Sequence, residues 1–140
     1  MNDRAFVDTN VIVHLFDART PDKRRAAAEL LARLAQQADA PVISTQVLQE
    51  AFSALTRKLG MDAQEALDTL RLTADGGFTV QPIDVPLVWK AALRSIEDTL
   101  SFWDALIVEA ARQAGCTVLY SEDMQTGRSF DGLTVRNPFS

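Results

Sequence analysis

Short apolar runs alternate along the chain with longer segments in which apolar residues recur every three or four positions. A short apolar run between turn residues is typical of a buried strand, and the longer repeat is typical of a helix with one buried face. The apolar runs predict strands at 5–7, 41–44, 78–80 and 117–120, with a last strand near 134–135.

Most of the predicted helices are bounded by residues that commonly start or end helices. Thr20-Pro21 and Ser101 are typical starts, and Gly60 and Gly115 are typical ends. The predicted helices lie at about 11–16, 20–37, 45–59, 62–73, 86–96 and 101–114.

Strands that alternate with amphipathic helices indicate a parallel sheet with helices on both faces. The chain of 140 residues is long enough for one such domain, which we assign to 1–140, and it contains no repeat or linker that would divide it. We therefore expect a single α/β domain with a mainly parallel sheet of four to five strands.

Charge and composition narrow the possible functions. The net charge is −5 and the pI is near 4.8, which disfavours a protein that holds nucleic acid on a broad basic surface. A local acidic site that binds cations would still allow phosphate chemistry. We find no secretion signal, no apolar stretch near the ~20 residues that span a bilayer, and a single cysteine, Cys116, so we expect a cytoplasmic protein with no membrane contact.

Four acidic residues follow predicted strands or lie in the first turns of helices behind them: Asp8, Glu50, Asp104 and Asp123. The carboxyl ends of parallel strands meet at one edge of an open sheet, which is where functional sites lie. Right-handed crossover connections bring all four acids to that edge.

Each acid also has a structural interpretation. Asp8 could close an Asx turn, Asp123 could cap a short helical turn, and Ser101-Phe-Trp-Asp104 fits a capping box. The helical phase favours function, because Asp104 lies on the apolar face of its helix and Glu50 borders the apolar face of another. A carboxylate that faces inward is unfavourable unless it is paired, protonated or bound to a cation, and no Lys or Arg stands beside these acids in the sequence.

The type of ligand indicates the type of metal. Carboxylate oxygens without a Cys or His cluster select Mg²⁺, with Mn²⁺ as a possible substitute, rather than zinc. One or two such ions commonly activate a water and stabilise negative charge on phosphoryl oxygens, and the sequence leaves the number of ions open.

Four blocks of sequence carry these acids in order along nearly the whole chain: Phe6-Val-Asp8-Thr9-Asn10, Gln46-Val-Leu-Gln-Glu50, Leu100-Ser-Phe-Trp-Asp104 and Tyr120-Ser121-Glu-Asp123. Together they resemble the PIN-domain toxins of bacterial VapBC toxin–antitoxin systems. The resemblance implies an α/β/α sandwich and Mg²⁺-dependent endonucleolytic cleavage of RNA. It also implies a cognate antitoxin as partner and a homodimer.

The same resemblance implies a role for each acid. Asp8 and Asp104 are the expected principal metal ligands, and Asp123 is an expected ligand, directly or through water. Glu50 is expected to orient or deprotonate the attacking water. Supporting hydrogen bonds are expected from Thr9, Asn10 and Ser121, although a Thr-Asn pair after a strand is just as often a helix cap.

Two other functions fit parts of the pattern. A haloacid-dehalogenase-like phosphatase also has an aspartate after its first strand, as a nucleophile, but it needs Asp-x-Asp, and Asn10 replaces the second acid. A PIN-like RNA-binding or regulatory module without catalysis would share the fold, although all four acids are present here.

Several neighbouring side chains are expected to be structural. We expect His14 on a helix surface, Trp103 in the core and Glu109 on the solvated face of its helix. Base stacking by Trp103 and phosphate binding by the basic run 23–25 are the less favoured alternatives.

Overall fold

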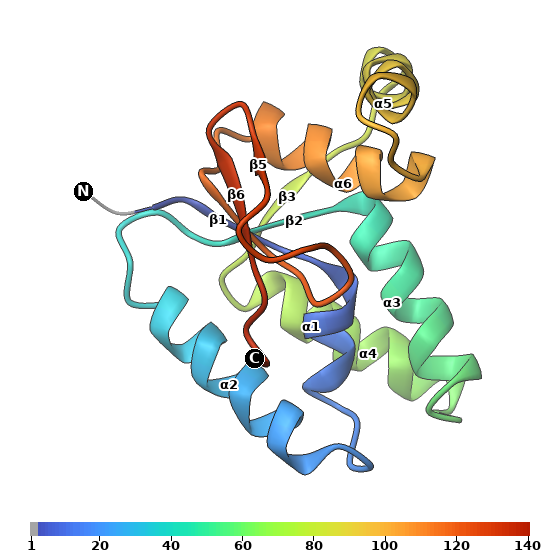
Figure 1. The fold of residues 1–140 in the computed structure, drawn as a ribbon. Coiled ribbons are helices and arrows are strands. Elements are labelled where there is room, and N and C mark those ends of the chain that lie inside the picture. Colours follow the sequence, from blue (N-terminus) through green and yellow to red (C-terminus); the bar gives the residue numbers. More distant parts are fainter. Residues whose placement is uncertain (1–2) are drawn as a thin grey trace.

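A six-stranded sheet forms the centre of the fold in a computed structural model that describes residues 3–140 (Figure 1). Residues 1 and 2 of the predicted domain lie outside the described residues. The strands are β1 (Ala5–Val7), β2 (Val42–Ser44), β3 (Thr79–Gln81), β4 (Val118–Tyr120), β5 (Ser129–Phe130) and β6 (Leu133–Arg136). The helices are α1 (Thr9–His14), α2 (Pro21–Leu34), α3 (Thr45–Arg57), α4 (Ala63–Asp75), α5 (Val85–Glu97) and α6 (Phe102–Gln113).

The strand order is β3-β2-β1-β4-β6-β5, and every neighbouring pair is parallel except β5 with β6. Phe6 of β1 lies opposite Val42 on one side and Leu119 on the other, so β1 is central. The predicted α/β fold with a mainly parallel sheet is confirmed, and the sheet has one strand more than the predicted four to five.

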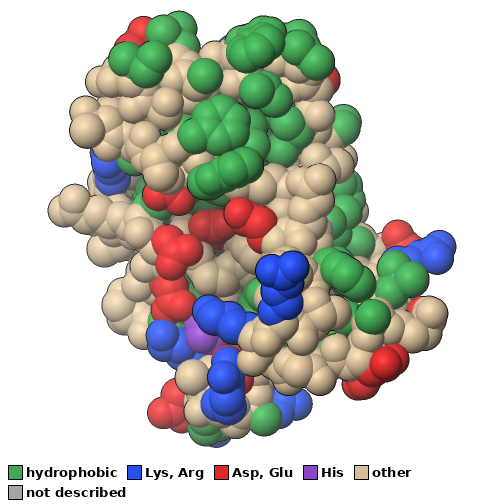
Figure 2. Space-filling model, turned by 90° about the vertical axis from the view of Figure 1, so that its right-hand side faces the viewer, with side chains coloured by type: hydrophobic (Ala, Val, Ile, Leu, Met, Phe, Trp, Pro, Cys, Tyr) green, Lys and Arg blue, Asp and Glu red, His purple; other side chains and the backbone are tan. Residues whose placement is uncertain are grey.

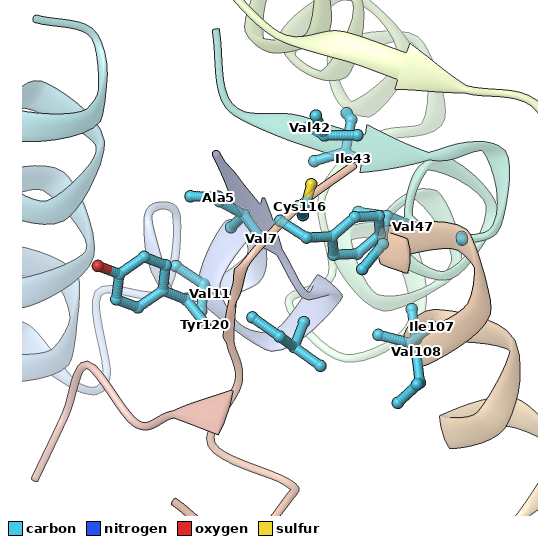
Figure 3. Packing of buried hydrophobic residues seen from close by; sticks show 14 of the residues in the cluster. Ala5, Val7, Val11, Val42, Ile43, Val47, Ile107, Val108, Cys116 and Tyr120 are labelled. Atoms are coloured by element: carbon cyan, nitrogen blue, oxygen red, sulfur yellow. The ribbon is translucent and has the colours of Figure 1, made fainter. Parts of the chain in front are cut away.

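The three central strands carry the core. Every residue of β1, β2 and β4 is buried, as expected for parallel strands with helices on both faces. Figure 3 shows Val11 of α1 beside Tyr120 of β4, with Val47 of α3 and Ile107 of α6 on the other side of Val7. Complete burial of such side chains stabilises the fold by roughly 1.5–3 kcal/mol each.

The helices cover the two faces of the sheet (Figure 1). Helices α5 and α6 pack against each other on one side, and α1 with α2 lies on the other. Helix α1 also contacts α3, which packs against α4. None of the described helices combines the length and apolar composition needed to cross a bilayer.

The starts of four helices follow from side-chain capping. A hydroxyl or carboxylate oxygen just before the helix accepts a hydrogen bond from a backbone N–H of the first turn, which otherwise has no partner in the helix. The capping residues are Ser44 for α3, Asp62 for α4, Asp84 for α5 and Ser101 for α6. Because Ser44 and Ser101 fix the starts of α3 and α6, they also fix the heights of Glu50 and Asp104 above the sheet.

The predicted exposure of Glu109 is wrong. Only 8% of this residue is exposed, and its Oε1 accepts a hydrogen bond from Nε of Arg94 at 2.7 Å. Arg94 lies on α5, which covers the polar face of α6 and supplies the charge partner that a buried carboxylate requires.

Candidate functional site

The four predicted acids all lie at the edge of the sheet where β1, β2 and β4 end. Asp8 follows β1 and Asp123 lies just after β4, while Glu50 is in the second turn of α3 and Asp104 in the first turn of α6. Acidic side chains gather in a hollow on this face of the molecule (Figure 2). The charges of Asp123 and Glu50 raise the pKa of Asp8 and of Asp104, so each of these two carboxylates lies within electrostatic reach of Asp123 and Glu50.

Asp8 is the most enclosed of the four, with 4% of the residue exposed. Its Oδ1 accepts a hydrogen bond from the Thr9 backbone N–H at 2.7 Å, and its Oδ2 accepts one from Ser121 Oγ at 2.7 Å. Burial raises the pKa of Asp8 to about 6, although these two hydrogen bonds oppose the change. Asp8 is therefore both the N-cap residue of α1 and an unusually basic carboxylate.

Asn10 connects two of the acids. Its Nδ2 lies 3.0 Å from Asp123 Oδ2 and 3.4 Å from Asp8 Oδ2, and its Oδ1 accepts the Glu122 backbone N–H at 3.2 Å. Ser121 Oγ accepts the Asp123 backbone N–H at 3.2 Å. Asn10 and Ser121 thus hold the segment after β4 against the start of α1.

Glu50 is held by two donors. Thr9 Oγ1 donates to Glu50 Oε1 at 2.8 Å, and Gln46 Nε2 lies 3.4 Å from Glu50 Oε2. Gln46 Nε2 also donates to the backbone oxygen of Trp103 at 3.1 Å, which links α3 to α6. Gln46 is a site residue that was not predicted from the sequence. Its sequence signal is a polar residue one helical turn before Glu50, and the structure shows that this residue is buried.

Asp104 takes part in one half of the capping box that its sequence suggested. Its backbone N–H donates to Ser101 Oγ at 3.1 Å, which is one half of a capping box. No hydrogen bond from the Ser101 N–H to the Asp104 carboxylate completes the box within residues 3–140. Burial raises the pKa of this carboxylate, with smaller contributions from the charges of Asp123 and Glu50.

Glu122, a carboxylate beside the four acids, is bound by two basic side chains. Glu122 Oε1 lies 2.7 Å from His14 Nε2, and Glu122 Oε2 lies 2.7 Å from Lys23 Nζ. Burial alone would raise the pKa of Glu122, but the hydrogen bonds from Lys23 and His14 lower it overall. The predicted surface position of His14 is wrong, because only 13% of its side chain is exposed. The predicted core position of Trp103 is also wrong, because 61% of that residue is exposed.

The donor set fits a hard divalent cation. All four acids offer carboxylate oxygens, and none of them is ion-paired to a Lys or Arg among the described residues. No three His, Cys, Asp or Glu side chains of residues 3–140 converge into a ready-made metal site, and the Asn10 amide lies between Asp8 and Asp123. Asp8, Glu50, Asp104 and Asp123 are the side chains that would hold Mg²⁺, an ion that usually keeps several waters and is bound by one or two carboxylates.

Sequence and structure comparisons define the class of protein. The chain matches the PIN domain family over residues 5–128 and belongs to that family. A comparison with curated proteins finds no match. Family membership leaves the haloacid-dehalogenase-like alternative without support.

Several solved structures have the same fold as this chain. VapC20 of Mycobacterium tuberculosis, described as a sarcin–ricin loop cleaving toxin, is 27% identical over 84% of this chain and 88% of its own, with a TM-score of 0.59. A toxin–antitoxin complex from Klebsiella pneumoniae is 20% identical, covers 96% of this chain and 97% of its own, and gives a TM-score of 0.70. VapBC-1 from nontypeable Haemophilus influenzae is 16% identical over 97% and 98% of the chains, with a TM-score of 0.69. The family match and the fold shared with these toxin and toxin–antitoxin structures confirm the resemblance drawn from the sequence.

Proposed function

We propose that this protein is a Mg²⁺-dependent endoribonuclease that hydrolyses RNA phosphodiester bonds, and that Mn²⁺ can substitute. The observation that carries the proposal is the buried Asp8 carboxylate, which lies among three further acids without a basic partner in the described chain. Such an arrangement is unfavourable unless a cation neutralises it during function. When bound, the metal supplies Lewis-acid stabilisation of phosphoryl charge and lowers the pKa of bound water.

The acidic side chains would have different roles in the reaction. Asp8 and Asp104 would hold the metal, and Asp123 would bind it directly or through water. Glu50 orients the attacking water or accepts its proton, because Thr9 and Gln46 fix both carboxylate oxygens of Glu50 at 2.8 and 3.4 Å. Thr9, Asn10 and Ser121 keep the acids in place through the contacts described above.

Cleavage of total cellular RNA by the purified protein tests this function. We expect new RNA ends with Mg²⁺ or Mn²⁺ and none with EDTA. Ca²⁺ should not support cleavage, because its longer and more flexible coordination aligns water and phosphate poorly. Sequencing of the new 5′ ends identifies the RNA that is cut. Cleavage that persists unchanged in excess EDTA would contradict the mechanism.

We also propose a cognate antitoxin as partner, because the structural neighbours come from toxin–antitoxin complexes. A largely apolar groove of about 640 Å³ between α3 and α4 offers a surface for its C-terminal part. The groove is lined mainly by Leu48, Phe52, Leu67, Leu70, Ala74 and Val80. Gln49 also lines it, whereas its neighbour Glu50 lies on the adjoining face of α3, so a segment that runs on from the groove around α3 can place a basic side chain beside the acids.

Paired substitutions on α4 test the groove. Leu67 lines it and is 42% exposed, whereas Leu72 on the same helix is 76% exposed and lies outside it. Leu67→Asp should weaken inhibition by the antitoxin at least tenfold and leave cleavage intact, because a charge would be buried on binding. Leu72→Asp is the control and should be inhibited like the wild type. Equal inhibition of all three proteins, measured by cleavage against antitoxin concentration, would rule out this surface.

A homodimer is part of the same proposal. Helix α5 carries an exposed apolar row, and large contiguous apolar surfaces usually mark interfaces. The row consists of Val85, Trp89, Leu93 and Ile96. We expect a second copy of the chain to cover this row.

The cytoplasmic location expected from the sequence stays a prediction.

A further inference from the structure

Helix α3 aligns three features along the candidate site. Gln46 in its first turn contacts the backbone of Trp103, Glu50 lies one turn further, and Lys58 is the C-cap residue. The twelve residues from Gln46 to Lys58 correspond to about 18 Å at 1.5 Å per residue. The acids therefore lie between an aromatic residue at one end and a lysine at the other.

Lys58 is available to a ligand. It lines a hollow of about 310 Å³ together with Glu50 and Asp123, and it makes no ion pair within residues 3–140. The two other carboxylates that line this hollow already have basic partners. Asp17 is 2.9 Å from Nε of Arg19, and Glu122 is bound by Lys23 and His14. Apart from Glu50 and Asp123, Lys58 is therefore the charged side chain of this hollow that has no ion-pair partner among the described residues.

Trp103 presents an open aromatic surface next to Asp104. The ring is supported from one side by Phe102, whose centroid is 5.1 Å away in an edge-to-face arrangement at 80°, and Phe102 packs against the core. Since 61% of Trp103 remains exposed, the tryptophan is held in place yet accessible. Figure 2 shows hydrophobic side chains along one side of the acidic group and Lys and Arg side chains along the other.

We propose that single-stranded RNA crosses the acid group along α3, with a backbone phosphate bound by Lys58 and a base stacked on Trp103. The proposal rests on the ribonuclease function proposed above and defines its substrate as unpaired RNA. Stacking on a side chain requires a base that is free of its pairing partner. We call this path from Trp103 past the acids to Lys58 the track; at the 3.4 Å spacing of a stacked strand, the 18 Å from Gln46 to Lys58 along α3 corresponds to about five nucleotides.

The track explains how an acidic protein can hold RNA. A strand that met only the four carboxylates would be repelled, and the net charge of −5 offers no general attraction. Lys58 provides a local phosphate contact, and Trp103 provides affinity that does not depend on charge. The two residues should therefore respond differently to salt.

Binding of a short labelled single-stranded RNA, followed by fluorescence anisotropy in Ca²⁺ over a series of salt concentrations, separates the two contributions. Lys58→Ala should reduce the steepness of the plot of log Kd against log salt by about 0.7, the value for one phosphate contact on a single strand. Trp103→Ala should weaken binding about 5- to 140-fold with an unchanged salt slope, and Trp103→Phe should restore most of the affinity. The control is Arg57→Ala, because Arg57 is exposed on α3 and lines neither this hollow nor the adjoining one.

Cleavage assays in Mg²⁺ distinguish failure of the track from failure of the ribonuclease proposal. In both variants KM should rise while kcat changes little, because neither side chain touches the reacting atoms. If the wild type cuts RNA and both variants bind and cut RNA as it does, the proposed RNA path is wrong and the proposed ribonuclease function is unaffected. If the wild type binds RNA with the predicted sensitivities but never cuts, the ribonuclease fails and the track stands.

Two further outcomes would overturn the track. Trp103→Ala could change the mass of the protein in solution and leave RNA affinity unchanged, which would assign the tryptophan to a protein interface. An RNA duplex that binds as tightly as the single strand, with the same dependence on Trp103, would contradict the requirement for an unpaired base.

Discussion

Asp8→Asn should abolish RNA cleavage and leave the metal-free protein at least as stable as the wild type. The loss of activity follows because the amide cannot supply the negative oxygen that a divalent cation requires. The stability follows because burial raises the pKa of Asp8 to about 6, so the ionised carboxylate is unfavourable in the folded state. The amide avoids that cost and its oxygen can still accept one of the two hydrogen bonds made by Asp8.

The raised pKa of Asp8 determines the direction in which the free energy of unfolding changes with pH. The unfolded chain loses the Asp8 proton near the usual value of 3.8, and the folded protein keeps it up to about 6. Between these values the folded state binds more protons, so the free energy of unfolding falls as pH rises through this window and stays lower above it. A difference of about two pKa units corresponds to about 3 kcal/mol. Urea unfolding curves across this window should show the fall in the wild type and a smaller one in Asp8→Asn.

Melting curves in EDTA and in Mg²⁺ complete this test. The wild type should gain stability from Mg²⁺ by mass action, and Asp8→Asn should gain little. Asp62→Ala is the matched control, because Asp62 caps α4 through the Glu65 N–H and is exposed. Its loss should cost about 0.5–2 kcal/mol and leave cleavage unchanged. If Asp8→Asn melts well below the wild type in EDTA and responds fully to Mg²⁺, Asp8 holds the fold and not the metal.

The order of the elements was predictable because the signals are local. Buried parallel strands give continuous apolar runs, and a capping side chain such as Ser101 or Asp62 is only a few residues from the N–H that it binds. The positions of the four acids were predictable for the same reason, because each acid follows a predicted strand or lies near the start of a predicted helix.

Strand β5 was missed although its turn has a clear sequence signal. Asp131-Gly132 lies between Phe130 and Leu133, and both turn residues have positive φ, 53° and 94°. This is the Asp-Gly pattern of a tight hairpin. Because β5 has only two residues, no alternation of apolar and polar positions accompanied the turn.

The errors at Trp103 and Glu109 have a common cause. Helical periodicity indicates which residues share a face of α6, but it cannot show what covers that face. Helix α5 covers Glu109 and supplies Arg94, whereas the open end of α6 leaves Trp103 exposed. The contact between His14 and Glu122 joins residues 108 positions apart, so no local pattern could have predicted it.

Growth arrest is the expected result when the wild-type chain is expressed in a host that lacks the antitoxin. Under the proposed function, uncontrolled cleavage of RNA stops growth, and co-expression of the cognate antitoxin should restore it. Asp8→Asn should relieve the arrest. Because this variant is expected to be at least as stable as the wild type, relief cannot come from degradation of an unfolded protein. Asp62→Ala should still arrest growth, since it weakens a cap and leaves the acids intact. Growth curves with matched protein levels on immunoblots make the comparison, and a host that grows equally well with the wild type and with Asp8→Asn would exclude the toxin proposal.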